Sequence, residues 1–150
     1  MLRRQVQRPP WSTENRIREN CTSCGDCIRA CPEAILISGP AGTPSVDFSN
    51  GACTFCGACA KSCQENVFQD VELDPWDLKA EITSACLLNI GISCQSCTDA
   101  CDEAALKFDM RAGIVGKVQV RPELCTACGA CVSVCPAGAI KIQTEMAPIS

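Results

Sequence analysis

Residues 21–32 read CTSCGDCIRACP and place four cysteines in the spacing C-x2-C-x2-C-x3-C, with a proline after the last cysteine. Residues 125–136, CTACGACVSVCP, repeat this pattern, and residues 53–64, CTFCGACAKSCQ, repeat it with a glutamine in place of the proline. A further group has seven residues rather than two in its first gap, and comprises Cys86, Cys94, Cys97 and Cys101. The four groups account for all 16 cysteines in the 150 residues.

This spacing is typical of the [4Fe–4S] motifs of bacterial ferredoxins. Three thiolates that lie close together in the chain can wrap around three irons of one cluster. The fourth cysteine lies too far along to close the same cube, and in two-cluster ferredoxins it binds the neighbouring cluster. The pattern therefore predicts four [4Fe–4S] clusters. Their expected metal-binding and cofactor-binding ligands are Cys21, Cys24, Cys27, Cys31, Cys53, Cys56, Cys59, Cys63, Cys86, Cys94, Cys97, Cys101, Cys125, Cys128, Cys131 and Cys135.

The segments between the motifs indicate which motifs pair. Residues 34–38 and 45–48 flank a Gly/Pro-containing turn, and residues 105–109 and 117–120 flank a second glycine-containing turn. Each pair predicts a β-hairpin between two motifs, which favours pairing in sequence order. The expected sets are Cys21, Cys24, Cys27 with Cys63; Cys53, Cys56, Cys59 with Cys31; Cys86, Cys94, Cys97 with Cys135; and Cys125, Cys128, Cys131 with Cys101. A nested arrangement, first motif with fourth and second with third, stays open as the alternative.

We therefore expect a small, loop-rich α+β fold of tandem ferredoxin-like lobes of the bacterial two-cluster type. The predicted division is a basic N-terminal arm at 1–19, a two-cluster lobe at 20–70, an acidic connector at 71–83, a two-cluster lobe at 84–143 and a C-terminal tail at 144–150. Asp77 is a candidate cap for a short helix that leads from the connector toward the third motif. Lobes of this size have marginal hydrophobic cores, so bound clusters are expected to help stabilise them.

Three glycines follow the second cysteine of a motif: Gly25, Gly57 and Gly129. They either let backbone N–H groups approach cluster sulfurs or satisfy a positive φ, and the sequence leaves both interpretations open. In the irregular third motif we align Thr98 with these glycines and Asp102 with the proline. Because its first gap is also longer, we expect the cluster held by this motif to be the most labile or to have a distinct potential.

The cysteines could serve a secreted disulfide scaffold or metal sites in a reducing compartment. The first 12 residues, MLRRQVQRPPWS, have neither the apolar region nor the cleavage site of a secretory signal. No stretch of about 18 apolar residues predicts a membrane span. We therefore expect a cytoplasmic protein whose cysteines bind metal.

Other metal chemistry and catalysis fit the sequence less well. Structural zinc uses two well-separated ligand pairs, and a redox dithiol needs only one C-x-x-C. The chain has no histidine, which excludes a Rieske centre and a Ser-His-Asp triad. It also lacks a dinucleotide-binding or phosphate-binding glycine motif. We expect no catalytic residues and an electron-transfer or accessory role rather than an enzyme.

The net charge of −4 and the scarcity of aromatic residues, four Phe and two Trp, disfavour nucleic-acid binding. Basic residues are concentrated in the first 18 positions, and six of the 17 acidic residues lie between positions 65 and 81. The bound clusters add further negative charge, so the holo-protein is expected to attract a partner with a basic docking surface.

Several segments together resemble the NapF family of ferredoxin-type accessory proteins of periplasmic nitrate reductase systems. They are RPPWS at 8–12, PSV at 44–46, CTFC at 53–56, WDL at 76–78, CQSCTDAC at 94–101 and CTACGAC at 125–131. The resemblance covers nearly the whole chain and implies a cytoplasmic protein with four [4Fe–4S] clusters. It also implies a partner, the molybdenum-containing catalytic subunit NapA, which such a protein contacts before export during maturation. The alternative is a general electron carrier or an electron-input subunit of another oxidoreductase, supplied by a redox donor protein.

Overall fold

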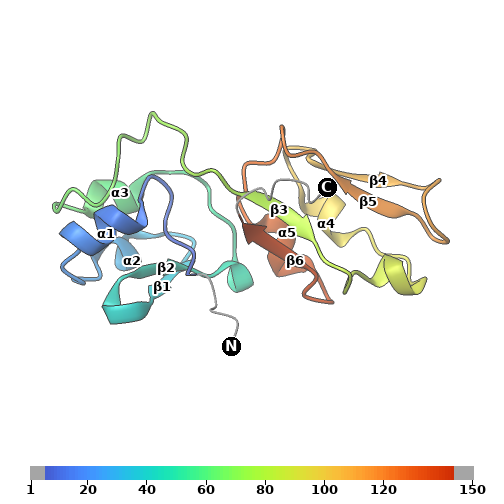
Figure 1. The fold of residues 1–150 in the computed structure, drawn as a ribbon, viewed down its shortest axis with the longest axis horizontal. Helices are drawn as coiled ribbons and strands as arrows, with labels where there is room; N and C mark the ends of the chain where they lie inside the picture. Colours follow the sequence, from blue (N-terminus) through green and yellow to red (C-terminus); the bar gives the residue numbers. More distant parts are fainter. Residues whose placement is uncertain (1–5, 144–150) are drawn as a thin grey trace. The chain divides into compact units, whose positions relative to one another are not determined.

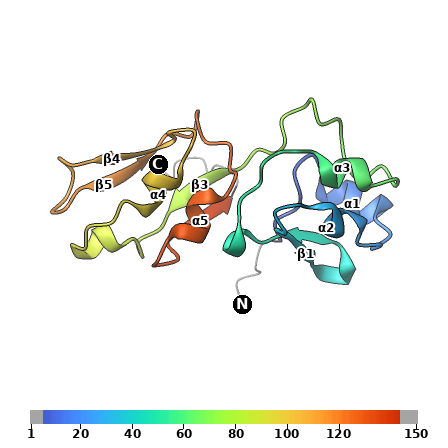
Figure 2. The same ribbon diagram turned by 180° about the vertical axis from the view of Figure 1, so that it is seen from behind.

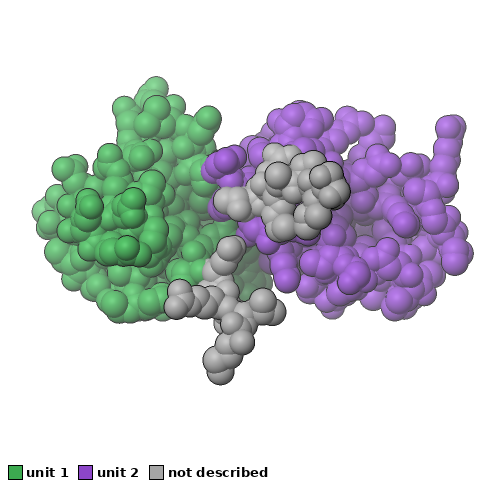
Figure 3. All heavy atoms as spheres, viewed as in Figure 1, with its two compact units in different colours: residues 1–76 green, residues 77–150 purple. Residues whose placement is uncertain are grey.

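The cysteine motifs are divided between two compact units of the chain, two motifs in each. In the computed structural model, which describes residues 6–143, unit 1 comprises residues 1–76 and unit 2 comprises residues 77–150 (Figure 3). Each unit consists of short helices and short strands joined by long loops (Figure 1). The chain thus has the expected small, loop-rich α+β fold of tandem lobes.

Unit 1 begins with a helix that the sequence did not predict. Its elements are α1 (Glu14–Asn20), α2 (Asp26–Ala30), β1 (Leu36–Ser38), η1 (Pro40–Gly42), β2 (Pro44–Val46), η2 (Phe48–Asn50) and α3 (Ala58–Ser62). Helix α1 starts after Thr13, whose hydroxyl oxygen accepts a hydrogen bond from the backbone N–H of Arg16. Ile17 on this helix is only 2 % exposed, so the helix contributes to the core of the unit.

The hairpin expected between the first two motifs is present. Strands β1 and β2 pair in antiparallel fashion, with Leu36 opposite Val46 and Ser38 opposite Pro44. Helix α2 packs against both α3 and β1. The hairpin therefore spans the sequence between the two motifs while their helices lie against each other.

Unit 2 repeats this plan with longer strands. Its elements are β3 (Lys79–Ile82), η3 (Leu87–Ile90), α4 (Ser96–Ala100), β4 (Leu106–Asp109), β5 (Lys117–Val120), α5 (Ala130–Val134) and β6 (Ile140–Gln143). Strands β4 and β5 form the second expected hairpin and run side by side in both views (Figures 1 and 2). Helix α4 packs against α5. Ala80, Leu106, Cys131 and Ile140 form the buried core of the unit.

The predicted acidic connector at 71–83 is wrong in its second half. Residues 79–82 form strand β3, which pairs antiparallel with β6, Ala80 lying opposite Ile142 and Ile82 opposite Ile140. Asp77 caps no helix, since the chain enters this strand two residues later. The strand forms because its alternate residues Ala80 and Ile82 can pack on the apolar core of unit 2.

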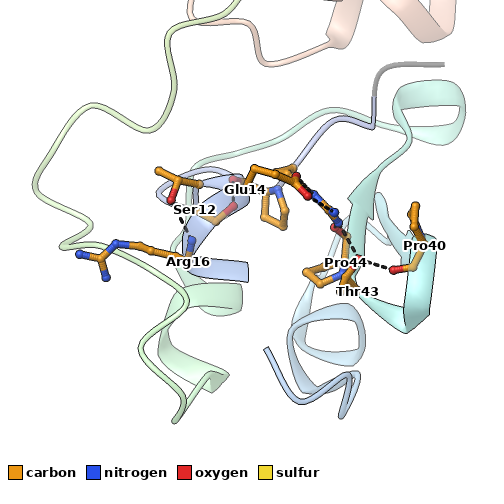
Figure 4. Close-up of polar contacts among 9 residues, drawn as sticks. Ser12, Glu14, Arg16, Pro40, Thr43 and Pro44 are labelled. Atoms are coloured by element: carbon orange, nitrogen blue, oxygen red, sulfur yellow. Dashed lines mark hydrogen bonds and ion pairs between the residues drawn. The ribbon is translucent and has the colours of Figure 1, made fainter. Parts of the chain in front are cut away.

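The predicted basic arm at 1–19 is also wrong for the residues that the structure describes. Trp11 is 5 % exposed, and Ser12 forms an isolated antiparallel bridge with Phe68. Arg8 is paired with Glu14, at 2.6 Å from Nε to Oε2, and donates to Thr43 Oγ1 at 2.7 Å (Figure 4). Residues 7–12, here termed the N-terminal strap, are therefore packed into unit 1, with Pro9, Pro10 and Trp11 buried. Residues 1–5 and the predicted tail at 144–150 lie outside the described residues.

The two corrections describe one feature of the fold. Phe68 follows Cys63 by five residues, and Ile140 follows Cys135 by five. In both units the segment that precedes the first motif therefore pairs with the segment that follows the second. The pairing is a four-residue ladder in unit 2 and a single bridge in unit 1.

Candidate iron–sulfur sites

The first site lies between the two motifs of unit 1. Cys21, Cys24 and Cys27, from the loop and helix α2, line one cavity together with Cys63, which follows α3. The backbone N–H of Ser23 donates to Sγ of Cys21 at 3.4 Å. Cys63 therefore lies with the first motif rather than with its own.

The second site in unit 1 has the reciprocal composition. Cys53, Cys56 and Cys59 line a cavity together with Cys31 of the first motif. The backbone N–H of Phe55 donates to Sγ of Cys53 at 3.4 Å. The wall also includes Pro10 and Trp11 of the N-terminal strap.

Unit 2 contains a third cavity of this kind. It is lined by Cys86, Cys94 and Cys97 together with Cys135. The backbone N–H of Ala139 donates to Sγ of Cys135 at 3.3 Å. The long gap between Cys86 and Cys94 thus does not prevent the irregular motif from surrounding a cavity.

The remaining four cysteines gather around Cys131. Cys101 and Cys125 pack against the buried core that contains Cys131, and the charges of Cys125 and Cys128 act on its thiol. The backbone N–H of Ala105 donates to Sγ of Cys101 at 3.3 Å, and that of Ala80 donates to Sγ of Cys125 at 3.4 Å. The three cavities thus bring twelve of the sixteen predicted ligands together in the combinations expected for pairing in sequence order, and Cys101 and Cys125 lie against the core that contains Cys131.

The third cysteine of each motif is the most deeply placed. Burial raises the pKa of the Cys27 and Cys97 thiols to about 11 and that of the Cys59 and Cys131 thiols to about 12. Neighbouring cysteines add to this increase in pKa. Among them are Cys27 acting on Cys59 and Cys97 acting on Cys131, each a cysteine of the other site in the same unit. The third cysteines therefore lie where the two sites of a unit adjoin.

These surroundings suit iron–sulfur clusters. Four thiol groups around each void supply the Cys₄ ligand set of a [4Fe–4S] cluster, and backbone N–H groups that point at the sulfurs stabilise the negative charge. Within residues 6–143, no three Cys, Asp or Glu side chains gather closely enough to hold a single metal ion. The cysteines of these sets lie around voids instead of converging on one point.

The glycines after the second cysteines have a conformational role. Gly25, Gly57 and Gly129 adopt φ values of 77°, 76° and 83° and each immediately precedes a motif helix. In the third motif this position belongs to Gln95, with φ of −131°, so the alignment of Thr98 with the glycines was wrong. Counting back from the start of helix α4 corrects it.

The N-terminal strap and strand β3 bring further groups to the sites, and of these two segments strand β3 was not predicted from the sequence. The ring of Trp11 lies edge-on to Phe55, with centroids 6.4 Å apart, and Phe55 in turn meets Trp76 at 5.7 Å. Phe55 belongs to the loop between Cys53 and Cys56, so this aromatic row backs directly onto a motif. The only advance signal was the position of both segments just before the first motif of a unit.

Comparison with known proteins agrees with this architecture. The family model for a 4Fe–4S dicluster domain matches twice, at residues 20–67 and 92–139. The ferredoxin-type protein NapF of Haemophilus influenzae is 46% identical over 137 residues, which cover 91% of this chain and 78% of that protein. The ferredoxin-type protein NapF of Escherichia coli K12 is 41% identical over 137 residues, covering 91% of this chain and 84% of that protein. An uncharacterized ferredoxin of Methanocaldococcus jannaschii is 34% identical over 55 residues, 37% of this chain.

Proposed function

Because this chain belongs to the NapF family of ferredoxin-type proteins, we propose that it contacts the nitrate reductase catalytic subunit NapA in the cytoplasm and supports its maturation before export. The chain is an iron–sulfur protein with two dicluster domains and four [4Fe–4S] clusters. When bound, each such cluster exchanges a single electron. The proposed role is to donate electrons to NapA, or to dock on it with a cluster-bearing surface, while NapA acquires its own cluster.

We assign all sixteen cysteines as ligands, in the four sets described above. The observation that carries the assignment is the reciprocal exchange of the fourth cysteine: Cys63 lines the cavity of the first motif, and Cys31 lines that of the second. This exchange is the ligand pattern of two-cluster ferredoxins. The deep position of the third cysteines places the two sites of each unit side by side, which suits electron exchange between them.

Unit 1 is the better candidate for electron exchange with a partner. Cys24 and Cys56 are exposed, whereas every cysteine of unit 2 is buried or partly buried. An exposed ligand brings a cluster edge close to the surface, where a docked protein can accept or donate an electron.

In the described part of the chain, none of the helices has the length and apolar character of a membrane span.

The test is anaerobic co-purification of the tagged full chain with NapA, expressed either with or without its export signal. We expect NapA to be retained, and retained more strongly in the form that still awaits export. A matched variant, Cys56→Ser together with Cys24→Ser, shows whether the cluster-bearing surface is needed for contact. Iron and sulfide analysis of the same samples verifies four clusters in the unmodified chain.

The alternative is a general electron carrier. It requires the same clusters and the same exposed ligands, but a different partner surface. Absence of contact with either form of NapA, combined with rapid reduction and reoxidation by other redox proteins, would favour this alternative and overturn the proposed maturation role. Loss of four-cluster stoichiometry would instead contradict the ligand assignment.

A further inference from the structure

Strand β3 delivers two groups to one of the cysteine sets of unit 2. The backbone N–H of Ala80 donates to Sγ of Cys125 at 3.4 Å, and Nζ of Lys79 donates to the carbonyl oxygen of Cys125 at 2.8 Å. Both residues lie 45 or more positions before Cys125, so neither contact belongs to the local motif loop. A hydrogen-bond donor and a cation therefore reach this cysteine from outside its motif.

The direction of the Ala80 N–H follows from the register of the strand. Thr83 donates its backbone N–H to Ala139 at 2.7 Å, at the end of the β3–β6 ladder. In an antiparallel pair, the N–H groups that face the partner strand belong to alternate residues. The backbone N–H of Glu81 therefore faces β6, whereas the backbone N–H of Ala80 faces away from β6 and toward Cys125. The N–H of Ala80 is thus available to the sulfur without loss of a ladder hydrogen bond.

Unit 1 has a proline at the corresponding position. The Ser12–Phe68 bridge corresponds to the Ile82–Ile140 pair, because Phe68 and Ile140 stand at the same distance after their cysteines. Counting back two residues from Ser12 aligns Pro10 with Ala80. Pro10 lines the cavity of Cys53, the counterpart of Cys125. Proline has no backbone N–H to donate.

The residues before Pro10 and Ala80 differ between the two units in the same way. Pro9 of unit 1 aligns with Lys79 of unit 2, so the cation near Cys125 has an apolar counterpart in unit 1. Cys53 does accept the N–H of Phe55 from its own motif loop. An N–H from the motif loop therefore reaches Cys53, whereas an N–H from strand β3 reaches Cys125.

We propose that Ala80 and Lys79 raise the reduction potential of the cluster bound by Cys125, and that Pro9 and Pro10 do not supply these two contributions to its counterpart at Cys53. Reduction adds negative charge, which an N–H dipole and a nearby cation stabilise. The segment before the motifs thus tunes one cluster in unit 2 by a means that the aligned segment of unit 1 does not provide. This inference rests on the ligand assignment proposed above, and treats these residues as tuning groups rather than ligands.

The test is an EPR-monitored redox titration of the full chain carrying Ala80→Pro. This change removes the N–H to the sulfur and leaves the ladder hydrogen bonds, since Ala80 faces away from β6. We expect one of four potentials to become more negative while the other three stay unchanged. The matched control is Ala80→Gly, which keeps the N–H and is expected to leave all four potentials in place.

The reciprocal variant, Pro10→Ala, restores an N–H in unit 1 and is expected to make one potential more positive. If the Ala80→Pro variant does not retain its clusters, the Pro10→Ala variant still tests the tuning proposal. Four intact clusters whose potentials do not move in either variant would overturn the tuning proposal while leaving the ligand assignment intact. Cys125→Ser separately tests that assignment, because iron and sulfide content should then fall while the Ala80→Gly control keeps full content.

Discussion

The indole Nε1–H of Trp11 donates to the carbonyl oxygen of Leu73 at 2.8 Å, 62 positions further along the chain. The backbone of Trp11 also donates to Pro75 at 2.6 Å and accepts from Gln69 at 2.6 Å. One residue of the N-terminal strap therefore holds the acidic loop 69–75 while its ring helps line the cavity of Cys53. The beginning and the end of unit 1 are joined at this residue.

Replacing Trp11 should weaken retention of the clusters in unit 1. Trp11→Phe removes the hydrogen bond but keeps an aromatic wall, and we expect a loss of about 1 kcal/mol in stability. Trp11→Ala also removes the wall, with an expected loss of about 3–5 kcal/mol. The measurement is the rate at which visible cluster absorbance decays in guanidinium under anaerobic conditions.

The control for the Trp11 variants is Ile17→Ala. Ile17 on helix α1 is 2 % exposed, so this change creates a cavity in the core of unit 1 away from the aromatic wall. Iron analysis at partial decay should show that Trp11→Ala releases two of the four clusters early, because unit 1 holds two. Uniform loss of all four clusters would contradict a role confined to unit 1. If Ile17→Ala released the same number of clusters early as Trp11→Ala, general packing of unit 1 would be responsible, and not the aromatic wall that Trp11 provides.

The metal-free protein should become less stable as the pH rises above about 9. The thiol of Cys27 has a pKa raised from 9.0 to about 11, and that of Cys59 is raised to about 12, because both are buried. Below pH 9 these thiols are protonated in both the folded and the unfolded chain. Between pH 9 and 12 the unfolded chain loses these protons first, so the folded state is progressively destabilised.

Alkylation provides the site-resolved measurement for this pH dependence. With iodoacetamide at pH 8 on anaerobically prepared metal-free protein, Cys24 and Cys56 should react first because they are exposed. Cys27 and Cys59 should react last, since little thiolate is present, and should approach the others near pH 11–12. Equal labelling rates of all four cysteines at pH 8 would refute the prediction.

Gly57→Ala should lower stability through backbone strain alone. Gly57 has φ of 76°, and an added Cβ would lie 3.5 Å from Cγ1 of Val71, an ordinary contact distance. We therefore expect a cost of about 1–2 kcal/mol from the left-handed conformation, without a steric clash. The reverse change in the third motif, Gln95→Gly, should bring no gain, because Gln95 already has a negative φ of −131°. Thermal loss of cluster absorbance in the two variants tests both statements.

The cluster bound by Cys86 should be released first by an iron chelator. The gap after Cys86 contains η3 and two exposed side chains, Ile90 at 70% and Ile92 at 49%, with Leu88 as its buried residue. A segment with few buried contacts opens more readily than the short loops of the other motifs. Differential alkylation after partial chelation should label Cys86 and Cys94 before Cys21 and Cys24. The opposite order would refute this expectation.

The sequence was most informative where the spacing of ligands restricts the chain. The four motifs and the exchange of Cys31 and Cys63 follow from how short loops surround a cluster, and the two hairpins follow from the glycine-containing turns between the motifs. Strand β3 and the strap were missed for a physical reason. Each is a short segment whose partner lies more than 50 residues away, and neither carries a long alternating pattern.

The two missed segments also explain why the division of the chain was wrong. Charge suggested an arm before residue 20 and a connector at 71–83, but burial of Trp11 and Ala80 assigns parts of both to the units that follow them. Charged residues such as Arg8 and Lys79 are paired within their own units, with Glu14 and with the carbonyl oxygen of Cys125. A run of charge thus marked the surface of a packed segment rather than a linker.

The exchange of the fourth cysteine has a consequence for biosynthesis. Under the proposed ligand sets, the two clusters of unit 1 have all their ligands once the ribosome has released Cys59 and Cys63, whereas those of unit 2 must wait for Cys131 and Cys135. The loop at 69–75 that Trp11 anchors emerges soon after Cys63. Unit 1 can therefore mature while the rest of the polypeptide is still being translated.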